Sequence, residues 1–377
     1  MNVRIAGCGH TRFGRLREGF LDLARAAGRE ALDDAGVQAV DRVYVSAQAP
    51  EAFAGVANAA VAVATELGLA GVAATRVETA PSSGLSAVEA ACHAIAAGQA
   101  QTALVVGAEK MTTLPTPRAS AVLAAMIHPS ERRYGLTMPA LAALTTRAWM
   151  HARGLSREDL AAAPVKAHAH GARNPLAQFR RRVLVEDVLA SPLVADPVRV
   201  LDCASMADGA AAVVLSARRG ETRVAGLGHA TDDLSLAGRT DPDALVSFRA
   251  TRAAAARCAR SARKSVRDVD VVEMHDAFAV LEFQNLVDLG LVPRSRVRRA
   301  VLSGDTSLGG SLPVNPGGGI KARGHPVGAT GVAQVVEIHR QLRGDAGRRQ
   351  VDGARRGLVH NIGGYGNNVL VALLEAA

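Results

Sequence analysis

Cysteine is scarce in this sequence, and its spacing excludes several kinds of site. The four cysteines, at positions 8, 92, 203 and 258, form no CxxC pair and no metal-ligand pattern. Structural zinc sites and small disulfide-stapled secreted domains both depend on closely spaced cysteines. We therefore predict no metal site and a reducing compartment.

Long apolar runs are lacking as well. Apolar stretches such as residues 59–65 are far shorter than the roughly 20 residues that a membrane-spanning helix needs. The chain enters the candidate strand at Val3 without the charged leader and apolar segment of a secretory signal. We expect a cytoplasmic protein with no membrane partner.

Aromatic side chains make up only 3% of the 377 residues, and nearly all of the positive charge is arginine. The formal net charge is +9, yet the arginines are spread along the chain and no nucleic-acid recognition motif accompanies them. Nucleic-acid modules combine clustered basic residues with stacking aromatics or a recognisable motif. We predict no nucleic-acid partner and a basic surface with charge available for an anionic ligand.

The composition is 49% hydrophobic, enough for a large core divided into two or three compact units. Residues 1–115 alternate between strand and helix patterns. The expected strands are 3–8, 42–46, 75–80 and 102–107, and the expected helices are 19–35 and 84–97. This alternation predicts an α/β fold with helices packed on a mainly parallel sheet.

Residues 116–199 form a different unit, because two prolines in 112–120 end the alternation. Helical patterns there cover 138–153, 156–170 and 185–189, and Pro164 is expected to split or kink the second of them. Residues 200–220 contain a further strand at 210–215, which would complete the sheet of residues 1–115.

The alternation returns in residues 221–377. Strands are predicted at 223–227, 270–274, 356–360 and 368–374, and helices at 242–265, 279–289 and 331–342. Ser83-Gly84 opens a helix as Thr330-Gly331 does, a weak sign of internal duplication.

The stretch 315–331, NPGGGIKARGHPVGATG, organises the candidate site. Its glycines allow close approach of the backbone to a ligand, and its last residues open an apolar helix whose free amides face the same place. A lone histidine is more often a structural residue than a catalytic one. His325, held between Gly324 and Pro326 beside a helix N-terminus, is instead predicted to be a functional residue.

This stretch resembles the histidine-bearing signature of the thiolase superfamily, and the resemblance implies that His325 is the general base. Further motifs agree in order: VETAPSSG (77–84), GAEKM (107–111), MADGAAAVVLS (206–216), VEMHDAFAVLE (272–282) and HNIGGYG (360–366). HDAF and the HN before the last glycines resemble the sterol-carrier-protein-2-type branch. The resemblance covers nearly the whole chain.

The resemblance implies a thiolase fold, with a duplicated five-layer αβαβα core and an inserted helical loop domain. Its units would be 1–115 completed by 200–220, the loop domain 116–199, and 221–377. It implies a coenzyme A thioester as substrate, no covalently bound cofactor, and a homodimer that pairs sheets edge to edge. Many proteins of this branch also work beside a small OB-fold, zinc-ribbon partner.

The cysteine nucleophile of this superfamily is missing. Relatives have roughly V-E-x-A-C-x-S-G where this chain has VETAPSSG, so Pro81 occupies the nucleophile position. Proline offers neither a thiol nor a backbone N–H. The second thiolase cysteine would fall on Ala277, or on His360 or Asn361 depending on register. A shift of one residue would make Ser82 the nucleophile with His325 as its base, although Ser82 also fits a helix N-cap.

The other polar positions of the pocket are kept. By resemblance, His275 would hold a water or donate to a thioester carbonyl, and the loop from His360 to Gly364 would offer amides. Tyr365 is either a packing residue or an acid/base, because thiolase-like aldolases that lack the cysteine are thought to use tyrosine.

Coenzyme A contacts are expected in residues 166–182, where charge is concentrated in the loop domain. Lys166, Arg180 and Arg181 are the candidates, with close backbone approach at Gly318 and Gly364. A solvated helix face is the alternative interpretation of this charge.

Three functions remain open from the sequence. The first is carbon-carbon bond cleavage or formation at an acyl-CoA by aldol chemistry. The second is acetyl-CoA acetyltransferase chemistry through Ser82. The third is a silent scaffold subunit of an acyltransferase complex.

Overall fold

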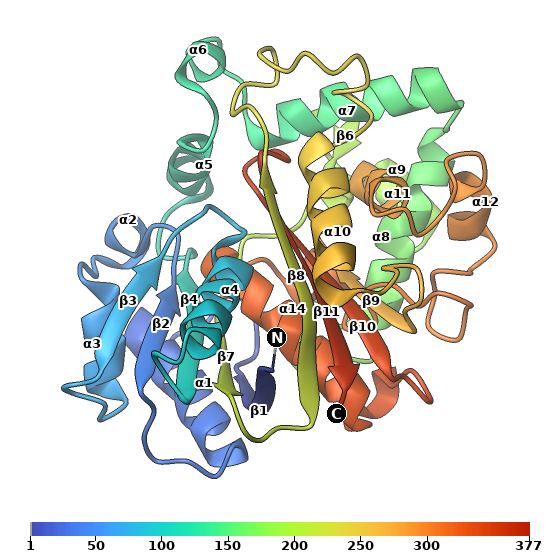
Figure 1. Cartoon of the computed structure of the whole chain (residues 1–377). Helices are drawn as coiled ribbons and strands as arrows, with labels where there is room; N and C mark the ends of the chain where they lie inside the picture. Colours follow the sequence, from blue (N-terminus) through green and yellow to red (C-terminus); the bar gives the residue numbers. More distant parts are fainter. Residues whose placement is uncertain (1) are drawn as a thin grey trace.

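The computed structural model describes residues 2–377 and contains one mixed sheet of nine strands (Figure 1). The strand order is β3-β2-β4-β7-β1-β8-β11-β10-β9. The strands are β1 (Arg4–His10), β2 (Arg42–Ser46), β3 (Ala73–Val77), β4 (Thr102–Lys110), β7 (Asp208–Ser216), β8 (Thr222–Thr231), β9 (Val271–Met274), β10 (Arg356–Gly363) and β11 (Asn368–Ala376).

The sheet consists of two halves with the same topology, joined only by a short β1–β8 pairing. In the first half, β7 is antiparallel to both β1 and β4, and β4 is parallel to β2. In the second half, β11 is antiparallel to both β8 and β10, and β10 is parallel to β9. Val314 makes an isolated parallel bridge to Val272, matching the place of β3 beside β2. The internal duplication is therefore present.

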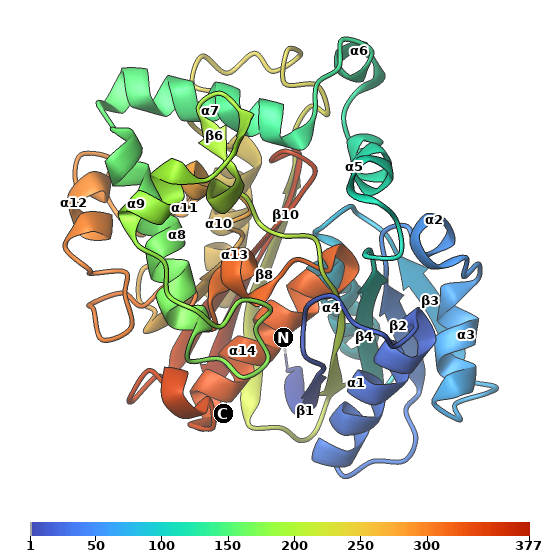
Figure 2. The ribbon, with the colours of Figure 1, turned by 180° about the vertical axis from the view of Figure 1, so that it is seen from behind.

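Helices complete five layers around these half-sheets. Helices α1 (Phe20–Asp34) and α3 (Ala59–Glu66) cover the outer face of the first half, and α10 (Arg249–Ala262) covers that of the second. Between the halves, α4 (Ser83–Ala96) packs against α14 (Val327–Arg343). Figures 1 and 2 show α14 crossing the centre of the molecule. This αβαβα layering confirms the fold expected from the sequence.

Two glycines let the central helices meet at their first turns. A Cβ atom on Gly84 would lie 2.6 Å from the backbone nitrogen of Val332, and one on Gly331 would lie 2.4 Å from that of Leu85. No side chain fits at either position without displacing backbone. The N-termini of α4 and α14 are thus held side by side, and they bring VETAPSSG and GHPVGATG to one place.

Of the segment between β4 and β7, the part coloured green in Figure 1 lies over the second half, whereas its first two helices, in teal, lie on the side of the first half. This segment, the loop domain, contains α5 (Thr116–Ala124), α6 (Pro129–Arg132), α7 (Met138–Arg153), α8 (Arg157–Gly171), α9 (Val185–Ala190), a hairpin of β5 (Leu193–Ala195) and β6 (Val198–Arg199), and the 3-10 turn η1 (Val200–Asp202). The remaining elements are α2 (Pro50–Ala54), α11 (Ala279–Asp288), α12 (Val297–Leu302), α13 (Gly319–Arg323) and the 3-10 turn η2 (Gly347–Arg349). The split of the second helix expected at Pro164 was wrong, because α8 runs through it.

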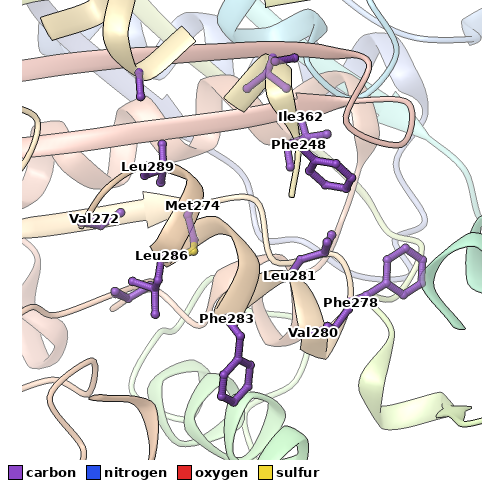
Figure 3. Packing of buried hydrophobic residues seen from close by; sticks show 14 of the residues in the cluster. Phe248, Val272, Met274, Phe278, Val280, Leu281, Phe283, Leu286, Leu289 and Ile362 are labelled. Atoms are coloured by element: carbon purple, nitrogen blue, oxygen red, sulfur yellow. The ribbon is translucent and has the colours of Figure 1, made fainter. Parts of the chain in front are cut away.

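The helix expected at 242–265 begins later, at Arg249. The buried carboxylate of Asp288 accepts hydrogen bonds from the Ser247 hydroxyl and the Phe248 amide, both at 2.6 Å. These bonds hold the chain extended just before the helix. Phe248 then joins the core around α11, where Phe283 and Leu286 pack (Figure 3). Along residues 2–377, no helix combines the length and apolarity that spanning a bilayer requires.

Candidate active site

The backbone around His325 fixes the position of this residue. Gly324 has a φ of +107°, a region that favours glycine, and Pro326 follows the histidine. The His325 amide donates to the Ser205 carbonyl at 3.0 Å. The imidazole is therefore held in front of the first turn of α14.

Thr330 sets the tautomer of His325. The Thr330 hydroxyl donates to the Pro326 carbonyl at 3.1 Å, so its oxygen accepts from Nδ1–H of His325, 2.7 Å away. A proton on Nδ1 leaves Nε2 of the neutral ring with a lone pair. His325 thus presents a base to the pocket.

His275 has the opposite arrangement. It follows β9, and its carbonyl accepts from the side chain of Asn285 at 2.7 Å. The Asn361 side-chain amide donates to Nδ1 of His275 at 3.3 Å, so in the neutral ring the proton is on Nε2. His275 thus presents a hydrogen-bond donor.

The two rings lie edge to face, with centroids 5.3 Å apart and an interplanar angle of 81°. Within residues 2–377, neither Nε2 atom has a hydrogen-bond partner, and neither is sealed from solvent. Burial lowers the pKa of His325 to about 3 and holds that of His275 well below its usual range. Both rings are neutral at pH 7, one an acceptor and one a donor.

His360 does not join this pair, so its expected catalytic position was wrong. Successive side chains of a strand point to opposite faces. Asn361 contacts His275, and His360 therefore points to the other face, where its Nε2 lies 3.4 Å from the Thr251 hydroxyl of α10. Asn361 is the polar residue that β10 supplies.

The loop that contains Pro81 lies at the start of α4. Ala80 adopts a positive φ of 57°, and Ser82 and Ser83 follow Pro81 into the helix. The Ser82 hydroxyl donates to the Thr79 carbonyl at 2.6 Å and accepts from Asn368 at 2.8 Å. It forms neither a hydrogen bond with His325 nor a side-chain cap of α4 within the described residues. Ser82 therefore occupies the expected N-cap position of α4, although its side chain does not cap the helix, and among the described residues it lacks the hydrogen bond to His325 that a nucleophile would need.

Tyr365 is buried on the turn between β10 and β11. Its hydroxyl donates to the Thr145 hydroxyl of α7 at 2.8 Å, and its ring packs edge to face on Phe248 with centroids 5.4 Å apart. Burial raises the pKa of the phenol. Tyr365 stays protonated and, in this arrangement, directs its proton towards the loop domain.

Comparison of the sequence with known protein families shows which family the chain belongs to. The description "Thiolase, N-terminal domain" matches residues 3–219, and "Thiolase C-terminal domain-like" matches residues 228–376. The chain belongs to the thiolase family.

Several relatives match along the whole chain. An acetyl-CoA acetyltransferase of Methanothermobacter thermautotrophicus is 39% identical and covers 99% of both chains. Sterol carrier protein 2 of Homo sapiens is 32% identical over 99% of this chain and 72% of its own length. These relatives confirm the expected sterol-carrier-protein-2-type branch.

Two solved structures share the fold. The structure described as "Ltp2-ChsH2(DUF35) aldolase" has a TM-score of 0.85 and 23% identity, covering 99% of this chain and 97% of its own. The acetyl-CoA acetyltransferase from Syntrophomonas wolfei has a TM-score of 0.74 and 18% identity, covering 100% and 99%.

None of the four cysteines of this thiolase-family chain is placed as a nucleophile beside the histidine pair. Burial raises the pKa of Cys8 to about 11 and those of Cys92, Cys203 and Cys258 to about 12. Within residues 2–377, no thiol is hydrogen-bonded to His275 or His325. The thiols are protonated and inert at neutral pH.

Lys166 was wrongly expected at a coenzyme A surface. Its ammonium is buried and pairs with the Glu282 carboxylate and, at 3.2 Å, with the Thr306 hydroxyl. Arg180 and Arg181, by contrast, are exposed. Gly318 has a φ of +102°, and a Cβ atom there would lie 2.8 Å from Gly171, so helix packing explains it. Gly364, at φ +57°, turns the chain between β10 and β11.

Sequence reasoning missed two supporting residues. Thr330 belongs to GHPVGATG, but a threonine at this position is equally typical of the start of a helix, so its hydrogen bond to His325 was not predicted. Glu109 accepts from the Gly328 amide at 3.0 Å and the Gln48 amide at 2.8 Å, which ties the first turn of α14 to the end of β4. Burial raises the Glu109 pKa to about 7 despite these bonds.

Proposed function

We propose that this chain is an enzyme that breaks or forms a carbon-carbon bond at an acyl-CoA thioester by retro-aldol or aldol chemistry, with no covalent acyl-enzyme. One observation carries the proposal. The site keeps a lone pair on His325 and a donor on His275, while proline stands where relatives have the attacking cysteine.

The two histidines match the needs of a retro-aldol step. Nε2 of His325 takes the proton of the 3-hydroxyl group, the bond between the α and β carbons breaks, and its electron pair forms the enolate of the thioester. The β carbon leaves as an aldehyde or ketone. Nε2–H of His275 donates to the enolate oxygen, and the proton held by His325 returns to the α carbon to give the shorter acyl-CoA. The reverse sequence is an aldol addition.

Tyr365 is a second hydrogen-bond donor that we propose for the enolate oxygen, beside His275. The phenol would exchange its hydrogen bond to Thr145 for one to the substrate. Changing Tyr365→Phe removes the proton but keeps the packing on Phe248. Loss of turnover with unchanged thermal stability would support the role. Full activity of Tyr365→Phe would show that the two histidines are sufficient and that Tyr365 has no part in the reaction.

The test uses 3-hydroxyacyl-CoA thioesters of several chain lengths and branching patterns. We expect release of an aldehyde or ketone and of the shorter acyl-CoA in equal amounts, measured by carbonyl trapping and by chromatography with mass spectrometry. His325→Ala should abolish release. No release from any thioester, alone or with a small OB-fold, zinc-ribbon partner, would refute the proposal.

Acyl transfer is the second candidate, because a relative with 39% identity is named acetyl-CoA acetyltransferase. It requires a nucleophile, and Ser82 is the hydroxyl beside Pro81. The hydrogen bonds of Ser82 to Thr79 and Asn368 argue against it. A labelled acyl group recovered on the Ser82 peptide would favour this function over the first.

A scaffold role gives a different result in the same assays. Turnover would then require a partner protein and would survive His325→Ala in this chain. One similar structure is of an aldolase, Ltp2, together with ChsH2(DUF35), which is why a partner belongs in the assay.

We also propose a homodimer formed through β3. This strand lies at one edge of the sheet and pairs only with β2 among the described residues. An edge strand offers unpaired backbone groups to a second copy. Light scattering should give twice the chain mass, and Thr75→Pro, which removes a backbone N–H from this edge strand, should give the monomer.

A further inference from the structure

Three arginines on the back of the molecule are left without partners. Arg173 and Arg180 follow α8, and Arg348 lies in η2 near the end of the chain. All three are exposed, and within residues 2–377 none has an ion pair or a side-chain hydrogen bond. Arg343, by contrast, is neutralised by Asp34, whose carboxylate lies 2.8 Å away.

The three guanidinium groups line one cleft of about 510 Å³. Arg340 and Arg349 also contribute to its wall, and each is paired on its own side, with Glu30 and Glu337. Asp345 is the one acidic residue among those lining the cleft, and its carboxylate is 3.3 Å from Nε of Arg343. The cleft therefore has an excess of positive charge that no group of the described chain offsets.

The location separates this cleft from the histidine pair. Figure 2 shows the segment after α8 passing over α14. His325 precedes the first turn of α14, and Arg340 lies in the last turn, so about 20 Å of helix separates them at 1.5 Å per residue. Pro175 and Leu176 add an apolar surface beside the arginines.

We infer that this cleft binds a small ligand that carries two or more phosphate groups. Arginine matches phosphate oxygens through its planar fork of N–H donors, and three forks from two distant segments can contact adjacent phosphates. The volume suits a nucleotide, which is larger than a single anion. The phosphates could belong to a free nucleotide or pyrophosphate, or to the nucleotide end of coenzyme A.

The test measures binding of inorganic pyrophosphate, adenosine 3′,5′-bisphosphate and coenzyme A to the whole chain by calorimetry. The double variant Arg173→Gln/Arg348→Gln should weaken pyrophosphate binding by more than about tenfold, because two charge-assisted contacts are lost. The matched control is Arg219→Gln/Arg260→Gln, which removes the same charge from exposed, unpaired positions elsewhere and should leave binding within about twofold. Melting temperatures check that both variants fold.

Measurements with the coenzyme A thioester identify the compound to which the phosphates belong. If the cleft variant raises the KM for the thioester and pyrophosphate competes with it, the cleft holds the nucleotide end of the substrate. If pyrophosphate binds while the KM is unchanged, the ligand is a separate phosphate compound. No saturable binding of any of the three ligands would overturn the inference. Equal weakening in both double variants would do the same, since it would indicate unspecific attraction.

Discussion

Asn361 donates to Nδ1 of His275, whereas Thr330 accepts from Nδ1 of His325, and these opposite bonds give two neighbouring histidines opposite tautomers. The rings are 5.3 Å apart and both are neutral. His325 can therefore act as a base and His275 as a hydrogen-bond donor while both rings are uncharged. The first two predictions follow from this relationship.

Changing Thr330→Val should lower kcat by roughly 10- to 100-fold, because His325 loses the acceptor that keeps its proton on Nδ1. KM should change little, since the hydroxyl does not face the substrate. Thr330→Ser keeps the oxygen and should restore most of the rate. Equal losses in the two variants would show that the methyl group, and not the hydroxyl, matters.

Changing Asn361→Asp should move the proton of His275 from Nε2 to Nδ1. The introduced carboxylate accepts where the amide donates, so His275 would present a lone pair to the pocket in place of a donor. We expect loss of turnover with retained folding. Nitrogen-15 spectra of the histidine rings report each tautomer directly. An unchanged His275 signal would contradict the assigned hydrogen bond.

Changing Pro81→Cys should place a reactive thiol in front of α4. A helix N-terminus lowers the pKa of a thiol, and the base His325 lies near the first turn of the neighbouring helix. We expect alkylation by iodoacetamide at pH 7 at least about tenfold faster than for the four native cysteines, whose pKa values burial raises to about 11 or 12. Mass spectrometry of the labelled peptides measures this. Slow labelling would mean that position 81 does not face the pocket.

Stability should fall as the pH is lowered from 7 towards 4. Burial lowers the pKa values of seven histidines, namely His10, His168, His170, His275, His325, His339 and His360. Below about pH 6.5 the unfolded chain binds protons at these rings and the folded chain does not, so acidification favours unfolding.

Buried acids oppose this trend in the same range. Glu109 and Glu273, with pKa values of about 7, and Asp288, at about 6, take up protons in the folded chain at a higher pH than in the unfolded chain. Burial also raises the pKa values of Asp276 and Asp345, and a hydrogen bond to Glu89 raises that of His229. These six groups are fewer than the seven histidines, so we expect a lower urea midpoint at pH 5 than at pH 7. His360 lies outside the histidine pair. The variant His360→Gln should reduce the pH dependence of the unfolding free energy by the equivalent of about one proton. A higher midpoint at pH 5 would contradict the assignment of neutral buried rings.

Local patterns were sufficient to predict most of the fold. Period-two and helical patterns located β2 and α7 to the residue, because buried strands and long helices carry their period along many positions. The start of α10 was misplaced because its cause, Asp288, is 40 residues away in sequence. Pro164 did not break α8, whose packing against α11 and α13 stabilises it.

The candidate site was predictable only in part. His325 and His275 follow from motifs that sit at the ends of a loop and a strand. The choice between His360 and Asn361 depends on which face of β10 is turned inwards, and one residue of register reverses it. Lys166 read as a surface charge because its partner, Glu282, belongs to a distant helix.

Intact-protein mass spectrometry during turnover tests the central claim most directly. The enzyme would be mixed with a 3-hydroxyacyl-CoA that it cleaves, quenched within the first turnovers and weighed while the released carbonyl compound is counted. The account predicts carbonyl product with no added mass on the chain. An acyl adduct that forms and decays at the rate of turnover, located on the peptide from Thr79 to Ser86, would contradict it.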